Sequence, residues 1–145
     1  FFQAEDGIRA SVASRGLGDV YKRQDIATDL ASVLQGGLGM AASANIGDNH
    51  MLFEPVHGSA PKYAGQGKVN PIAAISSVQL MLENLGVRHD DEDATICGEI
   101  LESAITSHLS EGGVTTYDLG GDANTVAVGT AISERYKALL NEHYI

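Results

Sequence analysis

The spacing of apolar and polar residues along the chain predicts four amphipathic helices. Their expected ranges are about 25–36, 71–85, 93–110 and 124 onward. Within each range, apolar side chains recur every three or four residues, which places them on one stripe of a helix. Glycines follow the first three ranges, and Gly is the residue that most often ends a helix.

The second, third and fourth of these helices carry signals at their ends. The second is expected to begin with Pro71 at its first position and to be capped by Gly86. Its apolar residues, Val78 among them, are dense enough to predict burial on most sides. An acidic run, Asp90–Asp93, precedes the third helix, where negative charge stabilises a helix N-terminus. Asn124 or the residue after it is expected to cap the last helix.

Between the first two helices the pattern changes to that of strands. Residues 37–48 alternate small and apolar side chains, which predicts a tightly packed strand followed by a turn. Residues 50–53 predict a second strand, and a turn-rich loop follows it as far as Asn70 and Pro71. Open α/β sheets bind nucleotides where a strand runs into such a loop and then a helix. On spacing alone, a surface connection whose polar residues face water is an equal alternative.

The composition restricts the class of protein and its partners. At 145 residues and 43% hydrophobic content, the sequence is that of an ordinary globular protein. A net charge of −10 disfavours nucleic-acid binding, which needs a basic face. No apolar run approaches the roughly 18 residues that a membrane helix needs, so a membrane is not an expected partner either. The single cysteine, Cys97, excludes an internal disulfide, is expected to be buried, and fits the cytoplasm.

Residues 1–24 differ from the rest of the chain. They hold four of the nine Lys and Arg residues and show no clean helical or strand period. Residues 3–9 resemble an in-frame translation of a sequencing adapter, and a divergent N-terminal arm is the alternative. We therefore predict a non-native or disordered leader up to residue 24, and treat residues 25–145 as the domain that carries function.

Two aspartates at the start of the first predicted helix are candidate metal ligands. Asp25 and Asp29 lie four residues apart, so both carboxylates leave the same face of the helix one turn from each other. A hard divalent ion such as Mg²⁺ or Mn²⁺ would turn their repulsion into a binding site. On spacing alone, a solvated acidic face is the better interpretation.

The loop after the second predicted strand reads Phe53-Glu54-Pro55-Val56-His57-Gly58-Ser59-Ala60-Pro61, and Asn70-Pro71 closes it. It resembles the adenine-binding loop of the isocitrate and isopropylmalate dehydrogenases, the metal-dependent decarboxylating dehydrogenases. The family's pattern F-E-x-x-H-G-[ST]-A-P, followed by N-P, is present without a gap. The match is long, and it is therefore far more specific than a short glycine motif.

Two further segments resemble the same family. Residues 25–29 match its metal helix, G-D-[IY]-x-[ST]-D, although Gln24 stands where the family has Gly. Residues 36–47 match G-G-[IL]-G-[ML]-A-P-[SG]-A-N-[IV]-G, although Ala42 stands where the family has Pro. The resemblance implies an α/β fold in which residues 25–145 form the C-terminal part of a three-layer αβα enzyme.

The resemblance also implies a chemistry. Such enzymes oxidise a 2-hydroxy acid bearing a 3-carboxylate, pass hydride to a nicotinamide, and release CO₂ with the help of a divalent metal. It assigns Asp25 and Asp29 as metal ligands, with a third ligand from a partner subunit, and thus implies a homodimer. It assigns to the cofactor Glu54, His57, Gly58, Ser59, Ala60, Lys62, Tyr63, Asn70, Tyr117 and Asp118. The acid–base residues and substrate arginines lie upstream of these motifs, so the chain as given is expected to be inactive alone.

The residues of the cofactor loops bear on cofactor choice. Family members that use NAD commonly carry an Asp where Lys62 stands, and that Asp would repel a 2′-phosphate. A Lys attracts the phosphate, and Tyr63 and Tyr117 can donate to it, so NADP is favoured and NAD stays possible. Some NADP enzymes place an Arg where this chain has Gly121. Isocitrate is the favoured substrate; the alternatives are 3-isopropylmalate, homoisocitrate, or a regulatory subunit that binds nucleotide without turnover.

Overall fold

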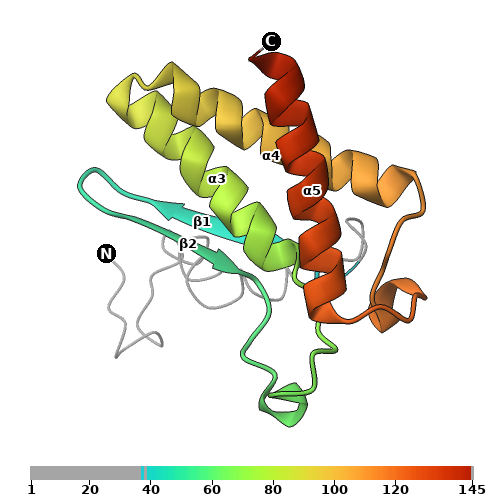
Figure 1. Ribbon diagram of the computed structural model, residues 1–145. Helices are drawn as coiled ribbons and strands as arrows, with labels where there is room; N and C mark the ends of the chain where they lie inside the picture. Colours follow the sequence, from blue (N-terminus) through green and yellow to red (C-terminus); the bar gives the residue numbers. More distant parts are fainter. Residues whose placement is uncertain (1–36, 38, 145) are drawn as a thin grey trace, which may run out of the picture.

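The computed structural model describes residue 37 and residues 39–144 (Figure 1). The predicted leader, the first predicted helix and the two candidate metal ligands lie outside the described residues. In chain order the elements are strands β1 (Ala42–Ile46) and β2 (Met51–Pro55), the 3₁₀ turn η4 (Pro61–Tyr63), helices α3 (Ile72–His89) and α4 (Glu92–Ser110), the 3₁₀ turn η5 (Tyr117–Leu119) and helix α5 (Thr125–His143). Both strands and the second, third and fourth predicted helices are confirmed.

Strands β1 and β2 form an antiparallel hairpin in which Ala44 pairs with Phe53. Side chains of a strand alternate between its two faces, and here the half-buried Phe53 lines a surface pocket with Met81 and Leu85 of α3 while its neighbours Leu52 and Glu54 are exposed. Arg88, near the end of α3, donates hydrogen bonds to two carbonyl groups in the hairpin turn. The end of α3 thereby holds the tip of the hairpin.

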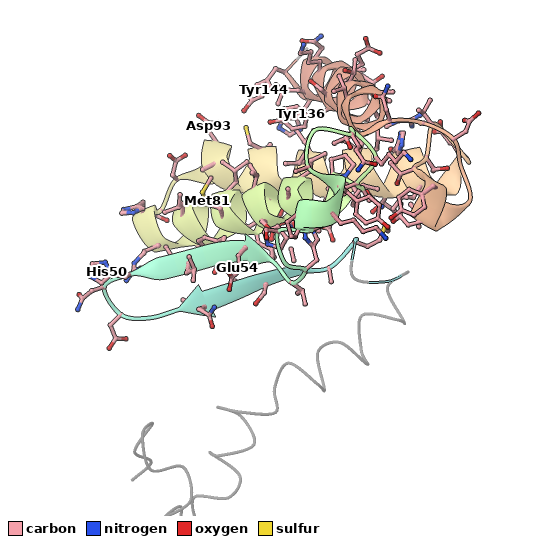
Figure 2. All side chains as sticks on the ribbon, turned by 90° about the horizontal axis from the view of Figure 1, so that it is seen from below. His50, Glu54, Met81, Asp93, Tyr136 and Tyr144 are labelled. Carbon is pink, nitrogen blue, oxygen red and sulfur yellow. The ribbon has the colours of Figure 1, made fainter. Side chains whose placement is uncertain are left out.

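The helices lie in layers above the hairpin, as Figures 1 and 2 show. Helix α3 packs on one face of the hairpin, α4 packs on α3, and α5 packs on α4. None of the described helices combines the length and the apolar character that a membrane-spanning segment needs. The hairpin and its helices confirm the α/β class.

Gly86 does not end α3, contrary to the sequence prediction. The helix continues to His89, and Asp90 caps it in the left-handed conformation at φ 54°. A Cβ atom on Gly86 would lie 2.7 Å from the backbone nitrogen of Thr95 and 2.8 Å from the carbonyl oxygen of Asp91. Gly86 is therefore the place where α3 and α4 approach each other closely, which a sequence period cannot reveal.

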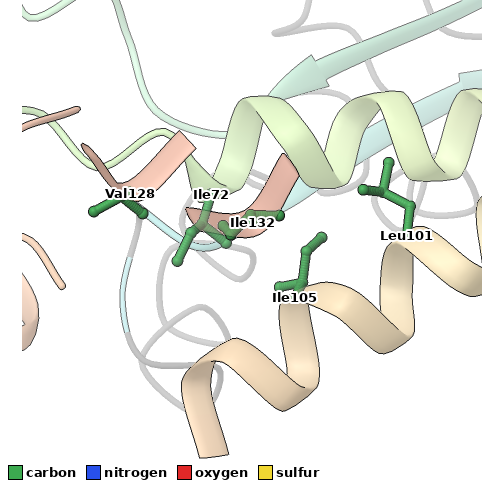
Figure 3. Close-up of a cluster of buried hydrophobic side chains, with 5 residues drawn as sticks. All are labelled: Ile72, Leu101, Ile105, Val128 and Ile132. Atoms are coloured by element: carbon green, nitrogen blue, oxygen red, sulfur yellow. The ribbon is translucent and has the colours of Figure 1, made fainter. Parts of the chain in front are cut away.

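The core lies where α4, α5 and the first residue of α3 meet (Figure 3). Its buried members are Ile72, Leu101, Ile105, Val128 and Ile132. The prediction that α3 is buried on most sides was wrong at Val78, which is 45% exposed, while Gln79 is buried and donates to Glu83. The hairpin and α4 cover two sides of α3, and the remaining side faces outward within the described part of the chain.

The N-terminal ends of α4 and α5 follow their predicted capping chemistry, whereas α3 begins at Ile72 and Pro71, expected at its first position, is the N-cap residue instead. The carboxylate of Asp91 accepts a hydrogen bond from the N–H of Ala94, with Glu92 in the first turn of α4. The side chain of Asn124 accepts one from the N–H of Ala127 at the start of α5. Cys97 was expected to be buried but is half-buried.

Candidate cofactor-binding site

A cavity of about 430 Å³ lies where four separate segments meet. These are the glycine-rich stretch before β1, the loop after β2, the residues before α3, and η5. Its lining residues are Gly39, His57, Gly58, Ser59, Ala60, Tyr63, Val69, Asn70, Tyr117 and Asp118. Eight of the ten residues predicted to bind a cofactor are in this set. The structure thus brings together eight predicted residues, from His57 to Asp118, that are up to 61 positions apart in the sequence.

The loop after β2 owes its shape to residues with unusual backbone angles. Ala60 adopts the left-handed conformation, with φ 45° and ψ 55°, immediately before the Pro that starts η4. This conformation costs a non-glycine residue roughly 1–2 kcal/mol, and such strain gathers at functional sites. Gly65 and Gly67 then take positive φ angles that reverse the chain. The carbonyl of Ala60 accepts a hydrogen bond from the N–H of Tyr63, which closes the turn.

The start of α5 anchors the second half of this loop. The backbone N–H of Thr125 donates to the carbonyl of Gly67 over 2.7 Å, and its hydroxyl donates to the carbonyl of Val69 over 2.5 Å. A loop held at both ends loses less conformational freedom when a ligand binds to it. The predicted sequence motifs contained no sign of this contact, because it joins residues 56 positions apart.

Two tyrosines from different loops stand together at the cavity. The ring centroids of Tyr63 and Tyr117 are 6.3 Å apart at 41°, and the ammonium of Lys62 lies 5.8 Å from the ring of Tyr63. The neighbouring hydroxyl of Tyr63, partial loss of water contact and the carboxylate of Asp118 raise the pKa of Tyr117. Tyr117 is therefore a neutral phenol at physiological pH and can donate a hydrogen bond to an anion.

Asn70 and Asp118 form the wall of the cavity nearest α3. The side-chain oxygen of Asn70 accepts a hydrogen bond from the N–H of Ile72 over 3.0 Å. Its amide nitrogen donates to the carboxylate of Asp118, also over 3.0 Å. Both ends of the Asn70 amide are thus bonded within the chain, and the residue is 7% exposed. It offers a ligand little of its side-chain surface.

His57 presents a ring nitrogen beside the cavity. Its Nδ1–H donates to the carbonyl of Gly58 over 2.9 Å, because a carbonyl can only accept. In the neutral ring this leaves Nε2 as an acceptor, suited to an amino group such as that of adenine. The position of His57 therefore allows the role predicted for it, stacking on or hydrogen bonding to an adenine.

The other predicted site residues lie elsewhere. Glu54 does not line the cavity: it lies in β2 opposite Ser43 and is exposed (Figure 2). Lys62 stands beside Tyr63 without lining the cavity. Asp25 and Asp29 lie outside the described residues. Within residues 39–144 the structure gathers no group of three His, Cys, Asp or Glu side chains that could hold a metal ion.

Gly121 occupies the position where some NADP enzymes carry an Arg. A Cβ atom built on it would overlap the carbonyl oxygen of Thr115. The same loop is closed by a hydrogen bond from the N–H of Gly121 to the carbonyl of Thr116 over 3.0 Å. An arginine at this position is therefore incompatible with the turn as it stands. Among the described residues, Lys62, Tyr63 and Tyr117 are the candidates beside the cavity that could contact a 2′-phosphate.

A buried histidine that the sequence left without a role supports this loop. His108, 3% exposed near the end of α4, donates from Nε2 to the carbonyl of Val114 over 2.9 Å. Glu111, one turn later, makes a bidentate ion pair with Arg135 of α5. The loop that carries Tyr117 is thus tied to both α4 and α5. A His on the buried face of a helix close to a loop was the available signal.

Comparison with known proteins identifies relatives of the chain. The family model for isocitrate/isopropylmalate dehydrogenase matches residues 23–133. The isocitrate/homoisocitrate dehydrogenase of Thermus thermophilus is 49% identical over 115 residues, which are 79% of this chain and 32% of that protein. The NADP isocitrate dehydrogenase of Archaeoglobus fulgidus is 46% identical over 73% of this chain and 24% of that protein.

A solved structure shows the same fold. The apo crystal structure of a beta-decarboxylating dehydrogenase from Thermococcus kodakarensis superposes with a TM-score of 0.71 at 40% identity, over 83% of this chain and 33% of that one. The chain therefore spans about a third or less of the length of these relatives. The extent of the family match shows that the chain belongs to the isocitrate/isopropylmalate dehydrogenase family.

Proposed function

We propose that this chain is the cofactor-binding part of an enzyme that oxidises and decarboxylates a 2-hydroxy acid with a 3-carboxylate, with NADP as hydride acceptor. The observation that carries the proposal is the cavity, around which eight of the ten predicted cofactor residues lie. Its volume of about 430 Å³ is in the range of small-molecule sites. When bound, the cofactor supplies the hydride acceptor, and the residues of this chain supply binding and orientation.

The chemistry of the lining fits the adenosine end of a dinucleotide. Gly58, Ser59 and Ala60 present backbone without bulky side chains, so that a ring can approach closely. His57 offers an acceptor nitrogen, and Tyr63 and Tyr117 offer aromatic faces and hydroxyl donors. Lys62 is one of two lysines on the loop between β2 and α3, in a chain whose net charge is −10. A local cationic site on an acidic protein suits a phosphate group.

The preference for NADP rests on Lys62, Tyr63 and Tyr117. A lysine ammonium attracts the 2′-phosphate of NADP, whereas an Asp in its place would repel that group and accept from the ribose hydroxyls of NAD. The relative from Archaeoglobus fulgidus is named as an NADP isocitrate dehydrogenase, which supports this choice. NAD remains the alternative because Gly121 supplies no side chain to the phosphate.

We further propose that Asp25 and Asp29 bind Mg²⁺ or Mn²⁺, which would act as a Lewis acid on the substrate. A third ligand from a partner subunit would make the active enzyme a homodimer. Isocitrate is the favoured substrate, and the family model's description favours 3-isopropylmalate as the second candidate. We place the enzyme in the cytoplasm, in keeping with the single free thiol of Cys97.

Two lysines of one loop provide a matched test of cofactor binding. Adenosine 2′,5′-bisphosphate and adenosine 5′-monophosphate are titrated into the full chain by isothermal calorimetry. Lys62→Ala is expected to weaken binding of the bisphosphate by about tenfold, because one charge-assisted hydrogen bond is worth roughly 1.5 kcal/mol, and to leave the monophosphate unchanged. The control Lys68→Ala should change neither affinity. Equal losses for both nucleotides would remove the case for NADP.

Turnover needs the rest of the enzyme. In a hybrid enzyme, residues 25–145 replace the matching C-terminal segment of the Thermus thermophilus relative. Formation of NADPH is measured with isocitrate or 3-isopropylmalate, with and without Mn²⁺. We expect Mn²⁺-dependent turnover that Asp29→Asn abolishes. Nucleotide binding without any turnover would instead support a regulatory subunit.

A further inference from the structure

A network of side-chain hydrogen bonds joins η5 to the start of α3 at the wall of the cavity. The hydroxyl of Thr116 donates to one carboxylate oxygen of Asp118 over 2.5 Å. The amide of Asn70 donates to the other oxygen over 3.0 Å, and the oxygen of Asn70 accepts from the N–H of Ile72. Each carboxylate oxygen of Asp118 already has a donor from this chain. We call these three side chains, Thr116, Asp118 and Asn70, the network.

The network sets the orientation of the Asn70 amide. The oxygen of the Asn70 amide faces the N–H of Ile72, and its nitrogen faces the carboxylate of Asp118. In a flipped amide, the NH₂ group would face the N–H donor and the oxygen would face the carboxylate acceptor, so both hydrogen bonds would be lost. Thr116 is 1% exposed and is not part of the cavity lining, so its hydroxyl can reach a ligand only through Asp118. Thr116 is therefore the buried member of the network, and Asp118 and Asn70 are the members that line the cavity.

The backbone before β1 is packed against the network. A Cβ atom on Gly39 would lie 3.0 Å from the Asp118 carboxylate and 3.3 Å from Cβ of Asn70. The carbonyl of Gly39 accepts a hydrogen bond from the N–H of Ala73 over 3.1 Å. The segments that carry Gly39, Asn70 and Asp118 thus meet at the Asp118 carboxylate. Two of them also cap α3, because the oxygens of Asn70 and Gly39 accept from the first two N–H groups of that helix.

We infer that Asp118 is a positioning residue, which acts through Asn70 and does not itself bind the cofactor. It holds the start of α3 against the loop of Tyr117, so that the cavity is already formed when the adenine end of the cofactor arrives. Preorganisation of this kind raises affinity because less conformational entropy is lost on binding. The inference rests on the proposed function and assigns Thr116, outside the cavity, as the residue that holds the carboxylate in place.

The substitution that isolates this role is Thr116→Val, which keeps the shape of the side chain and removes its donor. Adenosine 2′,5′-bisphosphate is titrated into the full chain, and amide hydrogen exchange is followed without ligand. We expect an affinity loss of about fivefold and exchange of the Ile72 amide faster by a similar factor, since a net hydrogen bond is worth roughly 1 kcal/mol. Amides in the middle of α4 and α5 should keep their exchange rates.

Two controls separate positioning from a general loss of structure. Thr116→Ser retains the hydroxyl and should restore both the affinity and the exchange rate of the parent. Thr130→Val, the same replacement at an exposed position on α5, should change neither quantity. A merely structural role for Thr116 would speed exchange in α4 and α5 as well, and that result would overturn the inference.

The remaining outcomes distinguish this inference from the proposed function. If Asp118→Ala weakens binding while Thr116→Val does not, Asp118 contacts the ligand directly and the inference is wrong. If Thr116→Val leaves both affinity and Ile72 exchange unchanged, the network has no positioning role and only the inference is lost. If the parent chain does not bind the bisphosphate at all, the proposed cofactor site is wrong and the inference fails with it.

Discussion

Replacing glycine by alanine is expected to have opposite effects on stability at two positions inside helices, Gly86 in α3 and Gly129 in α5. In Gly86→Ala, the new Cβ atom would lie 2.7 Å from the backbone nitrogen of Thr95. Restoring an ordinary contact of 3.4 Å requires α3 and α4 to move apart by about 0.7 Å. The side-chain oxygen of Thr95 is the nearest obstructing atom, but the backbone nitrogen of Thr95 and the carbonyl oxygen of Asp91 also obstruct, so a change of the Thr95 rotamer alone cannot relieve the overlap. Gly129, in α5, has no atom within 4 Å of its Cβ position.

The expected magnitudes follow from two opposing effects. Alanine is favoured over glycine in a helix by about 1 kcal/mol, and this gain applies at both positions. Overpacking against immobile atoms costs about 1–3 kcal/mol, and this cost applies only to Gly86→Ala. We therefore expect Gly129→Ala to raise the free energy of unfolding by up to about 1 kcal/mol, and Gly86→Ala to lower it by about 1–2 kcal/mol.

Urea unfolding of the full chain, followed by far-UV circular dichroism, measures both differences. If the slope of the unfolding free energy against urea concentration (the m-value) is the same in all three proteins, the two variants expose the same surface as the parent when they unfold. If Gly86→Ala is as stable as the parent, or if the two variants shift stability in the same direction, the close approach of α3 to α4 at Gly86 is refuted.

Three further predictions concern the core, the loop and an ion pair. Ile132→Ala should lower the free energy of unfolding by about 3 kcal/mol in the same assay, because Ile132 is 1% exposed in the core; a loss below 1 kcal/mol would contradict that packing. Ala60→Gly should relieve the left-handed backbone strain and stabilise the chain by less than about 1 kcal/mol, while a looser loop weakens binding of adenosine 2′,5′-bisphosphate; tighter binding would show that the strain has no function. Arg135 lowers the pKa of Glu111 below its ordinary 4.5, so this pair stabilises the folded state above pH 4.5 and the contribution is lost as pH falls through the folded pKa. The difference in urea midpoint between the parent and Arg135→Gln should accordingly shrink from pH 6 to pH 3, and a constant difference would mean that the pair contributes nothing.

Local patterns in the sequence were sufficient for the elements and for the family. The helical repeat of apolar residues predicted α3, α4 and α5, and the acidic run predicted the cap of α4 by Asp91. The alternation of small and apolar residues predicted the hairpin. The loop motif from Phe53 to Pro61 identified the family, which the comparisons confirm. Each of these signals is contained in a few consecutive residues, so a single sequence can display it.

The sequence predictions were wrong where the surroundings of a residue are set by a segment distant in the sequence. Gly86 was expected to cap α3, but its role is set by Thr95 on the facing helix. Val78 belongs to the apolar stripe of α3 and is nevertheless exposed, because the described elements cover only two sides of that helix. A helical period shows which side chains share a face; it does not show which faces other elements cover.

The sequence by itself determined the elements of this protein, its family, and most of the residues that line the cavity. Tertiary structure alone decided that Tyr117 stands beside Tyr63, that Asn70 bonds to Asp118, and that Gly121 has no room for an arginine. The physical reason is the range of the interactions. Periodicity, capping and turn chemistry act over a few residues, whereas the cavity depends on contacts between segments that only packing of the helices brings together.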